Sequence, residues 1–212
     1  MSSLFNELSE ALIERLETEN LLLRPYQEGD EGDFMRLILE NTSSLSPAFS
    51  GRLARVRVLE DARTQVQQLR TAWDNRKMFD FGVWLKKQEN YIGDIALKNF
   101  DYQIPKAELG LYFTGWPATR EYVQEALLAI LKLAFTNMSL NKVYIRLTQA
   151  NGFYAEVLEA CGFVKEGLLR NDYRGINTDE LLDLCYYGIT RHDYELRQQA
   201  SKTDSAETLA NA

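Results

Sequence analysis

The sequence has few of the residues from which proteins build metal sites and disulfides. Its one histidine, His192, excludes a multi-histidine metal site within the chain, so we expect no metal. Its two cysteines, Cys161 and Cys185, both lie in apolar stretches. Free cysteine behaves as a small apolar residue, and cytoplasmic proteins rarely carry disulfides. We therefore predict two buried free thiols in a protein of the reducing cytoplasm.

Basic residues are also in short supply, since 24 Lys and Arg stand against 31 Asp and Glu, a formal net charge of −7. A protein that binds nucleic acids needs a basic surface, so the composition argues against that class. It is compatible with a basic peptide or an amine as partner. No apolar run approaches the ~18 residues of a membrane span. No basic region followed by an apolar stretch opens the chain, so no signal peptide is expected.

The chain does have enough apolar material for one core, because 45% of its 212 residues are hydrophobic. We expect a single domain over residues 19–198, without a linker that would divide it. Residues 1–18 carry apolar side chains at helical spacing and predict an amphipathic N-terminal helix. Residues 199–212 are small, polar and acidic, which is typical of a mobile tail.

Between these ends, the apolar pattern alternates between the period of a strand and that of a helix, in the order β-α-α-β-β-β-α-β-α-β-β. A strand, a buried helix and a strand over residues 108–149 form a crossover unit, which predicts a parallel pair in the sheet. The fold class is therefore α/β or α+β with a mixed sheet. The expected strands are 21–26, 81–86, 91–100, 108–114, 141–149, 163–169 and 181–189, and the expected helices are 29–45, 63–76, 122–138 and 152–160, the last ended by Gly162.

Four segments keep the order and spacing of one known family across residues 16–190. They are Leu16–Tyr26 (LETENLLLRPY), Tyr91–Leu97 (YIGDIAL), Ala107–Phe113 (AELGLYF), and Asn151 and Tyr154 followed by Val157–Gly167 (VLEACGFVKEG). Together they resemble the GNAT superfamily of N-acetyltransferases, in its ribosomal-protein (RimJ/RimL-like) branch. One departure in the first segment is Asn20, which stands where that branch usually has arginine.

The resemblance implies a single GNAT fold, with a mixed, mostly antiparallel sheet splayed between its central strands and helices on both faces. Here the splayed strands would be Glu108–Thr114 and Asn141–Gln149. Acetyl-CoA, the co-substrate, would enter the opening and pair, as an extra strand does, with the backbone of Leu111, Tyr112, Phe113 and Thr114. The implied reaction moves the acetyl group to a primary amine of a peptide, such as a protein N-terminus, or of a small molecule. A homodimer is expected by analogy alone.

One loop departs from the family pattern at two glycines, which let backbone amides approach the coenzyme's pyrophosphate at a helix N-terminus. Thr119 and Glu121 replace these glycines in the aligned stretch Ala118, Thr119, Arg120, Glu121 and Tyr122. In one interpretation Arg120 turns towards a phosphate and the coenzyme still binds. In the other, Thr119 caps the helix, Glu121 repels the pyrophosphate, and the chain acts as a non-catalytic binding or regulatory module.

Acyl transfer from a thioester to an amine needs a proton donor for the departing thiolate and a route for the amine proton. Tyr154 stands where the branch has serine, and the resemblance implies that its hydroxyl is the general acid. The alternative is a ring packed at the start of a short helix. Glu108 would take the amine proton through a water if its side chain points into the cleft, and would otherwise be a solvated strand residue. Asn151 would contact the coenzyme or cap the helix that follows it.

Overall fold

The computed structural model describes residues 14–40, 55–114, 120–149, 152–175 and 179–210. The strands are β1 (Leu16–Glu17), β2 (Leu21–Arg24), β3 (Phe79–Leu85), β4 (Asn90–Asp101), β5 (Lys106–Phe113), β6 (Lys142–Thr148), β7 (Val164–Arg174) and β8 (Leu181–Thr190). The helices are α2 (Glu31–Glu40), α4 (Leu59–Asp74), α5 (Arg120–Lys132) with the π-helical turn η2 (Leu133–Asn137), α6 (Gly152–Ala160) and α7 (Arg191–Ala210).

The strands form one sheet in the order β1-β2-β3-β4-β5-β6-β8-β7. Neighbouring strands are antiparallel except β5 and β6, which are parallel and joined through α5. The parallel pair is the one that the crossover unit predicted. The predicted class, an α/β fold with a mixed and mostly antiparallel sheet, is confirmed.

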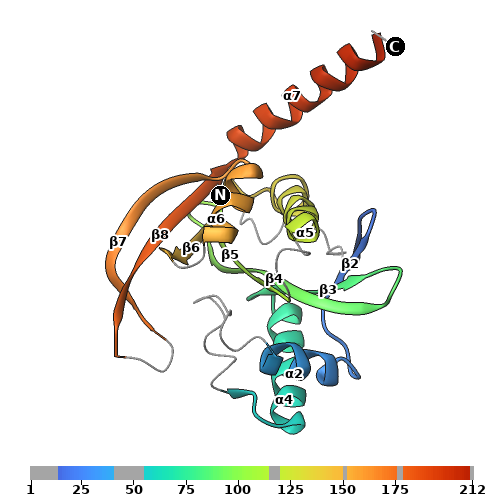
Figure 1. The fold of residues 1–212 in the computed structure, drawn as a ribbon, viewed down its shortest axis with the longest axis vertical. Coiled ribbons are helices and arrows are strands. Elements are labelled where there is room, and N and C mark those ends of the chain that lie inside the picture. The colour runs from blue at the N-terminus through green and yellow to red at the C-terminus, as the bar shows by residue number, and fades with distance from the viewer. Residues whose placement is uncertain (1–13, 41–54, 115–119, 150–151, 176–178, 211–212) are drawn as a thin grey trace.

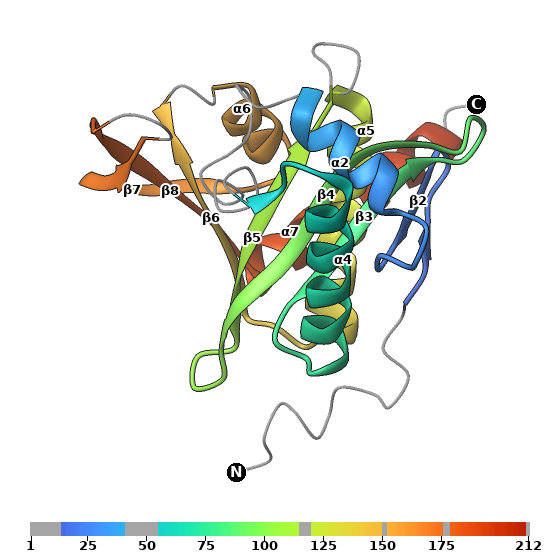
Figure 2. The ribbon, with the colours of Figure 1, turned by 90° about the horizontal axis from the view of Figure 1, so that it is seen from below.

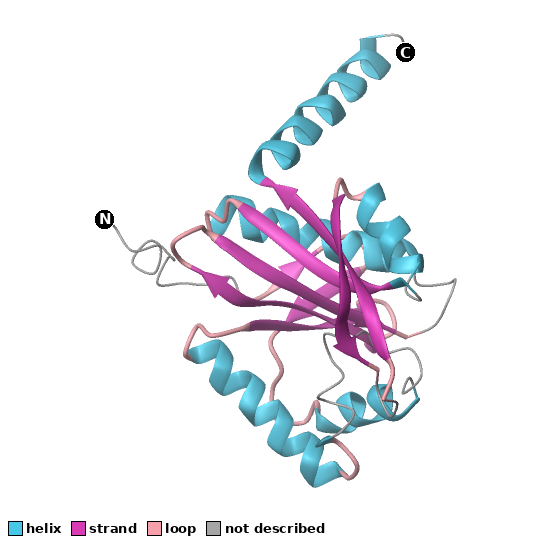
Figure 3. Cartoon of the chain, turned by 90° about the vertical axis from the view of Figure 1, so that its left-hand side faces the viewer, coloured by secondary structure: helices cyan, strands magenta, loops and turns pink. Residues whose placement is uncertain are grey.

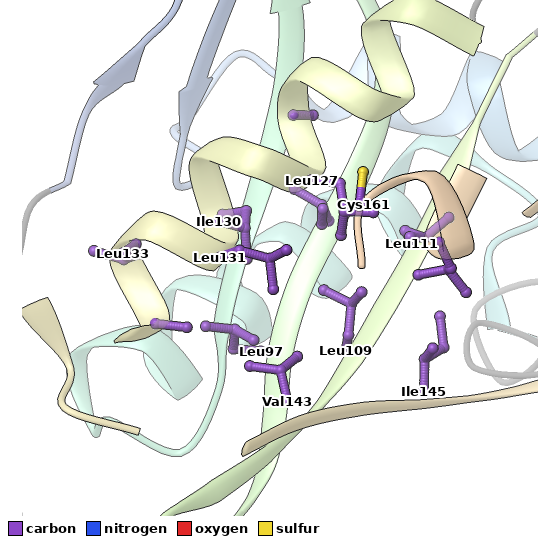
Figure 4. Close-up of a cluster of buried hydrophobic side chains, with 14 of the residues drawn as sticks. Leu97, Leu109, Leu111, Leu127, Ile130, Leu131, Leu133, Val143, Ile145 and Cys161 are labelled. Atoms are coloured by element: carbon purple, nitrogen blue, oxygen red, sulfur yellow. The ribbon is translucent and has the colours of Figure 1, made fainter. Parts of the chain in front are cut away.

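Helices cover the sheet on both faces, α5 and α6 on one side and α2 and α4 on the other (Figures 1 and 3). The buried side chains of α5 recur at three- and four-residue spacing and make one apolar stripe. In Figure 4, Leu127 and Leu131 of this stripe point towards the strands, where they meet Leu97, Leu109 and Val143. This face of the sheet therefore carries the larger core.

A second core lies between the sheet and the helices α2 and α4. It contains Phe34, Leu37 and Ile38 from α2 and Val66 and Leu69 from α4, all buried. Because helices press on both faces, central strands such as β5 are buried on both sides along nearly their whole length. That burial explains why the stretch AELGLYF is nearly continuously apolar.

The N-terminal segment differs from its prediction. Residues 1–13 of the helix expected over 1–18 lie outside the described residues. Leu16 and Glu17 are not helical: they form β1, opposite Leu23 and Leu22 of β2. The two residues lie at the end of the predicted helix, where backbone pairing with β2 outweighs the helical spacing of the apolar residues.

The helical segments differ in part from the predicted ones, and one helix was not predicted. The buried helix expected over 122–138 is α-helical to Lys132 and then widens into η2, where the N–H of Met138 bonds to the carbonyl of Leu133. The helix expected over 29–45 is described as α2 over Glu31–Glu40, and residues 41–45 lie outside the described ones. At the other end of the chain, α7 continues to Ala210 through the segment expected to be a tail. Alanine, glutamate, lysine and leucine in that segment favour a helix.

The helix α6 spans the predicted residues, and Gly162 follows it with φ +96°, the left-handed conformation that ends many helices. Cys161 and Cys185 are buried and free, as predicted. In the part of the chain that the structure describes, no helix is long and apolar enough to cross a membrane.

Candidate active site

The strands β5 and β6 separate after a short parallel ladder. Their register pairs Lys106 with Lys142, Ala107 with Val143 and Glu108 with Tyr144, and ends there. Both strands continue, β5 to Phe113 and β6 to Thr148, while their ribbons diverge (Figure 2). The predicted splay between the central strands is therefore present, with its narrow end at Glu108.

Tyr154, from the start of α6, reaches the edge of β5 on the far side of this splay. Its phenolic oxygen accepts a hydrogen bond of 3.1 Å from the backbone N–H of Phe113. The side chain is 8% exposed, and its ring belongs to the larger core. Burial raises the pKa of Tyr154 to about 12, against the opposite effect of the Phe113 N–H. The hydroxyl therefore keeps its proton at neutral pH, as a proton donor must.

The backbone of β5 presents alternate groups to its two edges. The N–H of Thr114 bonds to the carbonyl of Ile92 in β4, at 2.8 Å, whereas the N–H of Phe113 turns to the opposite edge. Strand geometry gives the N–H of Leu111 the same direction as that of Phe113. Among the four backbone positions expected to contact acetyl-CoA, Leu111 and Phe113 thus face the splay, and Thr114 faces β4. The side chain of Tyr112 lies on the opposite face of the sheet from those of Leu111 and Phe113.

The unusual loop is described from Arg120 onward. Ala118, Thr119 and Asn151 lie outside the described residues. Arg120 opens α5, and its guanidinium bonds to Glu156 of α6 at 2.9 Å, with both side chains well exposed. Glu121 is exposed in the first turn of the helix, and Tyr122 packs against the core.

Glu108 is neither a solvated strand residue nor a free carboxylate. It is 3% exposed and lies on the α2–α4 face of the sheet. Its carboxylate accepts a hydrogen bond of 2.7 Å from the Asn99 amide and bonds of 3.1 Å to both oxygens from the Arg146 guanidinium. Both of its oxygens are therefore already engaged by neighbouring side chains. Its role as base therefore stays a prediction, against which this ion pair weighs.

A cluster of hydroxyl groups on the same face was not expected from the sequence. We call Tyr26, Tyr91, Tyr112 and Asp94 the tyrosine cluster. The hydroxyls of Tyr26 and Tyr91 lie 2.7 Å apart, those of Tyr91 and Tyr112 lie 3.3 Å apart, and Tyr26 donates to Asp94. All four side chains are at most 2% exposed. Of the four, only Tyr112 was among the predicted site residues.

The register explains how Arg146 and Asp94 come to these places. Asp94 of β4 stands opposite Tyr112 of β5, so both side chains share one face. Arg146 stands two residues beyond Tyr144, the partner of Glu108, and long side chains reach across such a diagonal. The alternation of β6 predicts the face on which Arg146 lies. Val143, Ile145 and Leu147 point to the α5–α6 face, so Arg146 points to the opposite one.

Residues 20–164 match the family model described as an acetyltransferase (GNAT) domain. An N-acetyltransferase of Bacillus licheniformis, p20, named as uncharacterized, is 23% identical over 136 residues, which is 64% of this chain and 75% of that protein. The ribosomal α-N-protein acetyltransferase RimL in complex with coenzyme A superposes with a TM-score of 0.74 at 16% identity, over 84% of this chain and 98% of that one. A spermidine N-acetyltransferase of Vibrio cholerae, SpeG, superposes with a TM-score of 0.68 at 23% identity, over 85% and 99% of the two chains.

Proposed function

Because the chain belongs to the GNAT acetyltransferase family, we propose that it transfers an acetyl group from acetyl-CoA to a primary amine. The observation that carries the proposal is the hydrogen bond from the Phe113 N–H to Tyr154 at the splay of β5 and β6. It brings together, in one place, a backbone donor for the thioester oxygen and a protonated side-chain hydroxyl for the departing thiolate, two of the groups that thioester aminolysis needs besides an acceptor for the amine proton.

In this proposal the splay receives acetyl-CoA. The pantetheine arm pairs with the edge of β5 on which the N–H groups of Leu111 and Phe113 lie. The phenolic oxygen of Tyr154 marks the position of the thioester oxygen, because both are acceptors for the same Phe113 N–H. Binding then exchanges one acceptor for another and frees the Tyr154 hydroxyl to turn towards the sulfur. Acetyl-CoA supplies an activated acyl group, and Tyr154 supplies the proton for the departing thiolate.

The helix α5 is the proposed anchor for the pyrophosphate. Arg120 at its N-terminus is bound to Glu156, but this pair is exposed on both sides, and exposed ion pairs contribute only ~0–1 kcal/mol. A phosphate therefore competes for Arg120 at low cost. Glu121 in the same turn acts against the phosphate, since its carboxylate is a second anion at the positive end of the helix. We infer that the coenzyme binds here, but more weakly than it would without Glu121.

The acceptor class is a primary amine. The two structural neighbours bear the names of enzymes for a protein α-amino group and for spermidine, and a net charge of −7 favours cationic amines in either class. A protein N-terminus is the proposed acceptor on the strength of the segments shared with the ribosomal-protein branch.

Calorimetric titration of the purified chain with acetyl-CoA tests the first half of the proposal. A thiol-release assay tests the second, with spermidine and with hexapeptides that begin in free serine or alanine. Saturable binding and thiol release with one of these amines would support an N-acetyltransferase. Absence of binding at millimolar acetyl-CoA would contradict the proposal and favour a non-catalytic module.

A further inference from the structure

The base of the proposed reaction is unassigned, and the tyrosine cluster has the composition of a proton path. Its three hydroxyls and one carboxylate form a connected series, Tyr112–Tyr91–Tyr26–Asp94, with oxygen separations of 3.3 Å and 2.7 Å between the tyrosines. A hydroxyl accepts one proton while it donates another, so such a series transfers protons without leaving a charge on any of its tyrosines.

The two ends of this series have different surroundings. Tyr112 adjoins Phe113 along β5, but its side chain lies on the opposite face of the sheet from Phe113. Asp94, at the other end, stands opposite Tyr112 in the β4–β5 register, and Tyr26, which donates to Asp94, borders a cavity of about 660 Å³ that is also lined by Glu28, Glu31 and Arg63. The series therefore lies on the α2–α4 face of the sheet, and Tyr26 connects it to a groove with ionisable side chains.

We propose that Tyr112, relayed through Tyr91 and Tyr26 to Asp94, is the proton acceptor for the amine in the transfer reaction, and this inference rests on the proposed function. The amine nitrogen forms its bond to the acyl carbon while the carbon–sulfur bond breaks. An N–H proton passes to Tyr112, directly or through one water, as the Tyr112 proton passes to Tyr91, that of Tyr91 to Tyr26 and that of Tyr26 to Asp94. Tyr154 gives its proton to the sulfur and takes one back from solvent after the thiol has left. Asp94 returns its proton to solvent through the Tyr26 groove.

The surroundings of the series support this role. Burial and the Asp94 charge raise the pKa of Tyr26 well above its usual value, and burial with Tyr112 does the same for the pKa of Tyr91. Both tyrosines therefore stay neutral as carriers. Asp80 of β3 adds a second buried carboxylate whose charge acts on Tyr26.

The other side chains packed around the tyrosine cluster are mostly apolar. On the same face of the sheet, α2 and α4 contribute apolar side chains to the same buried cluster, and α4 also carries the buried polar Gln65. The other candidate base, Glu108, is bound to Arg146 instead. A proton that reaches the tyrosine cluster thus has the carboxylates of Asp94 and Asp80 as its acceptors.

The decisive variant is Tyr91→Phe, which removes one hydroxyl from the middle of the series and keeps the ring. We expect acetyl-CoA affinity within 2-fold of wild type and turnover with the best amine of the panel lowered roughly 100-fold. The pH–rate profile of the variant should lose its acidic limb and rise with hydroxide concentration. Tyr194→Phe, another buried tyrosine that packs on Phe135 away from the sheet's α2–α4 face, is the matched control.

Asp94→Asn gives an independent check. Groups that act in series lose function together, so the double variant with Tyr91→Phe should be no slower than the slower single variant. In the ligand-free protein, the hydroxyl proton between Tyr26 and Asp94 should give a low-field NMR resonance that shifts in Tyr91→Phe and not in Tyr194→Phe. This signal reports the series whether or not the protein is active.

The outcomes separate the two proposals. Wild-type turnover and an unchanged pH profile in folded Tyr91→Phe would overturn the relay and leave the acetyltransferase intact. Multiplicative losses in the double variant, or an NMR resonance indifferent to Tyr91, would also overturn it. If wild-type protein neither binds acetyl-CoA nor releases thiol, the proposed function fails first. Should Tyr91→Phe fail to fold, Tyr112→Phe gives the same readings from the substrate end.

Discussion

The N–H of Phe113 on β5 and the phenolic oxygen of Tyr154 on α6 lie 3.1 Å apart and share a hydrogen bond. This contact ties the helix that follows β6 to the edge of β5, across the opening where the two strands have parted. It also gives Tyr154 two roles that separate experiments can distinguish, one in packing and one in proton donation.

Tyr154→Phe should lower turnover roughly 100-fold, because the thiolate loses its proton donor while the ring still fills the same space. Acetyl-CoA should bind at least as tightly, since the Phe113 N–H no longer has an internal acceptor. Steady-state rates and calorimetry on the same preparation measure both quantities, with Tyr194→Phe as the control for a buried hydroxyl. Wild-type rates in the variant would remove Tyr154 from the mechanism.

Tyr154 should also make stability depend on pH in the alkaline range. A tyrosine in the unfolded chain has its ordinary pKa of about 10, whereas burial raises the pKa of folded Tyr154 to about 12, so the folded state holds the proton more tightly. The contribution is therefore complete below about pH 10 and is lost as pH rises through about 12, a total of about 2–3 kcal/mol. Urea unfolding of wild type and Tyr154→Phe from about pH 8 to about pH 11 measures the difference. The variant should show the flatter curve over this range, and parallel curves would contradict the assignment.

Glu156→Gln should strengthen coenzyme binding about 2- to 5-fold, because it releases Arg120 from an exposed ion pair for the pyrophosphate. Glu121→Gln should strengthen it further, since it removes an anion from the first turn of α5. Titration calorimetry with acetyl-CoA at low salt measures both, and Glu159→Gln, an exposed change on α6, is the control. Unchanged affinity in both variants would place the pyrophosphate elsewhere.

Glu108→Gln distinguishes a structural role of Glu108 from a catalytic one. The change leaves the half-exposed Arg146 guanidinium without its counter-ion, so we expect a loss of about 1–3 kcal/mol in the free energy of unfolding. Turnover should stay within a few-fold of wild type, because the proposed proton path runs through Tyr112. Chemical denaturation and rate measurements decide the point. A large loss of turnover with unchanged stability would identify Glu108 as the base.

Gly93 should tolerate no side chain. A Cβ there would lie 2.5 Å from the Phe113 ring and 2.6 Å from the backbone oxygen of Tyr112, so a backbone atom of the neighbouring strand would have to move. Gly93→Ala should therefore destabilise the protein by about 1–3 kcal/mol and disturb Phe113 directly. Gly32→Ala in α2, where nothing lies within 4 Å of an added Cβ, should instead stabilise by about 0.5–1 kcal/mol. Thermal unfolding of both variants tests the contrast.

Local patterns predicted most of the fold. The helix over Gly152–Ala160 and the parallel pair β5–β6 followed from apolar spacing and from the crossover unit. The strand β1 and the π-helical turn η2 did not, because each depends on a partner or a hydrogen bond that periodicity does not encode. Helix α7 was missed because a polar composition alone does not exclude a helix.

The site was predicted less completely, for a related reason. The resemblance indicated Tyr154 and the β5 backbone. The partners of Glu108 depend on which residues stand opposite each other, and the β4–β5 register shifts between Lys98 and Asp101, next to Asn99. Sequence alternation assigns a face to a side chain but not its neighbours, so neither the Arg146 ion pair nor the tyrosine cluster was foreseeable.

The short ladder between β5 and β6 has a mechanical consequence. Only three residue pairs in the described strands connect β5 with β6. The sheet therefore consists of two hydrogen-bonded halves, β1 to β5 and β6, β8 and β7, and the connection between them ends at Glu108 and Tyr144. A ligand that lies along the diverging edges of β5 and β6 adds backbone contacts on the side where the two halves are farthest apart. Such a ligand restricts the motion of one half of the sheet relative to the other. Amide hydrogen exchange should therefore slow in both halves when it binds.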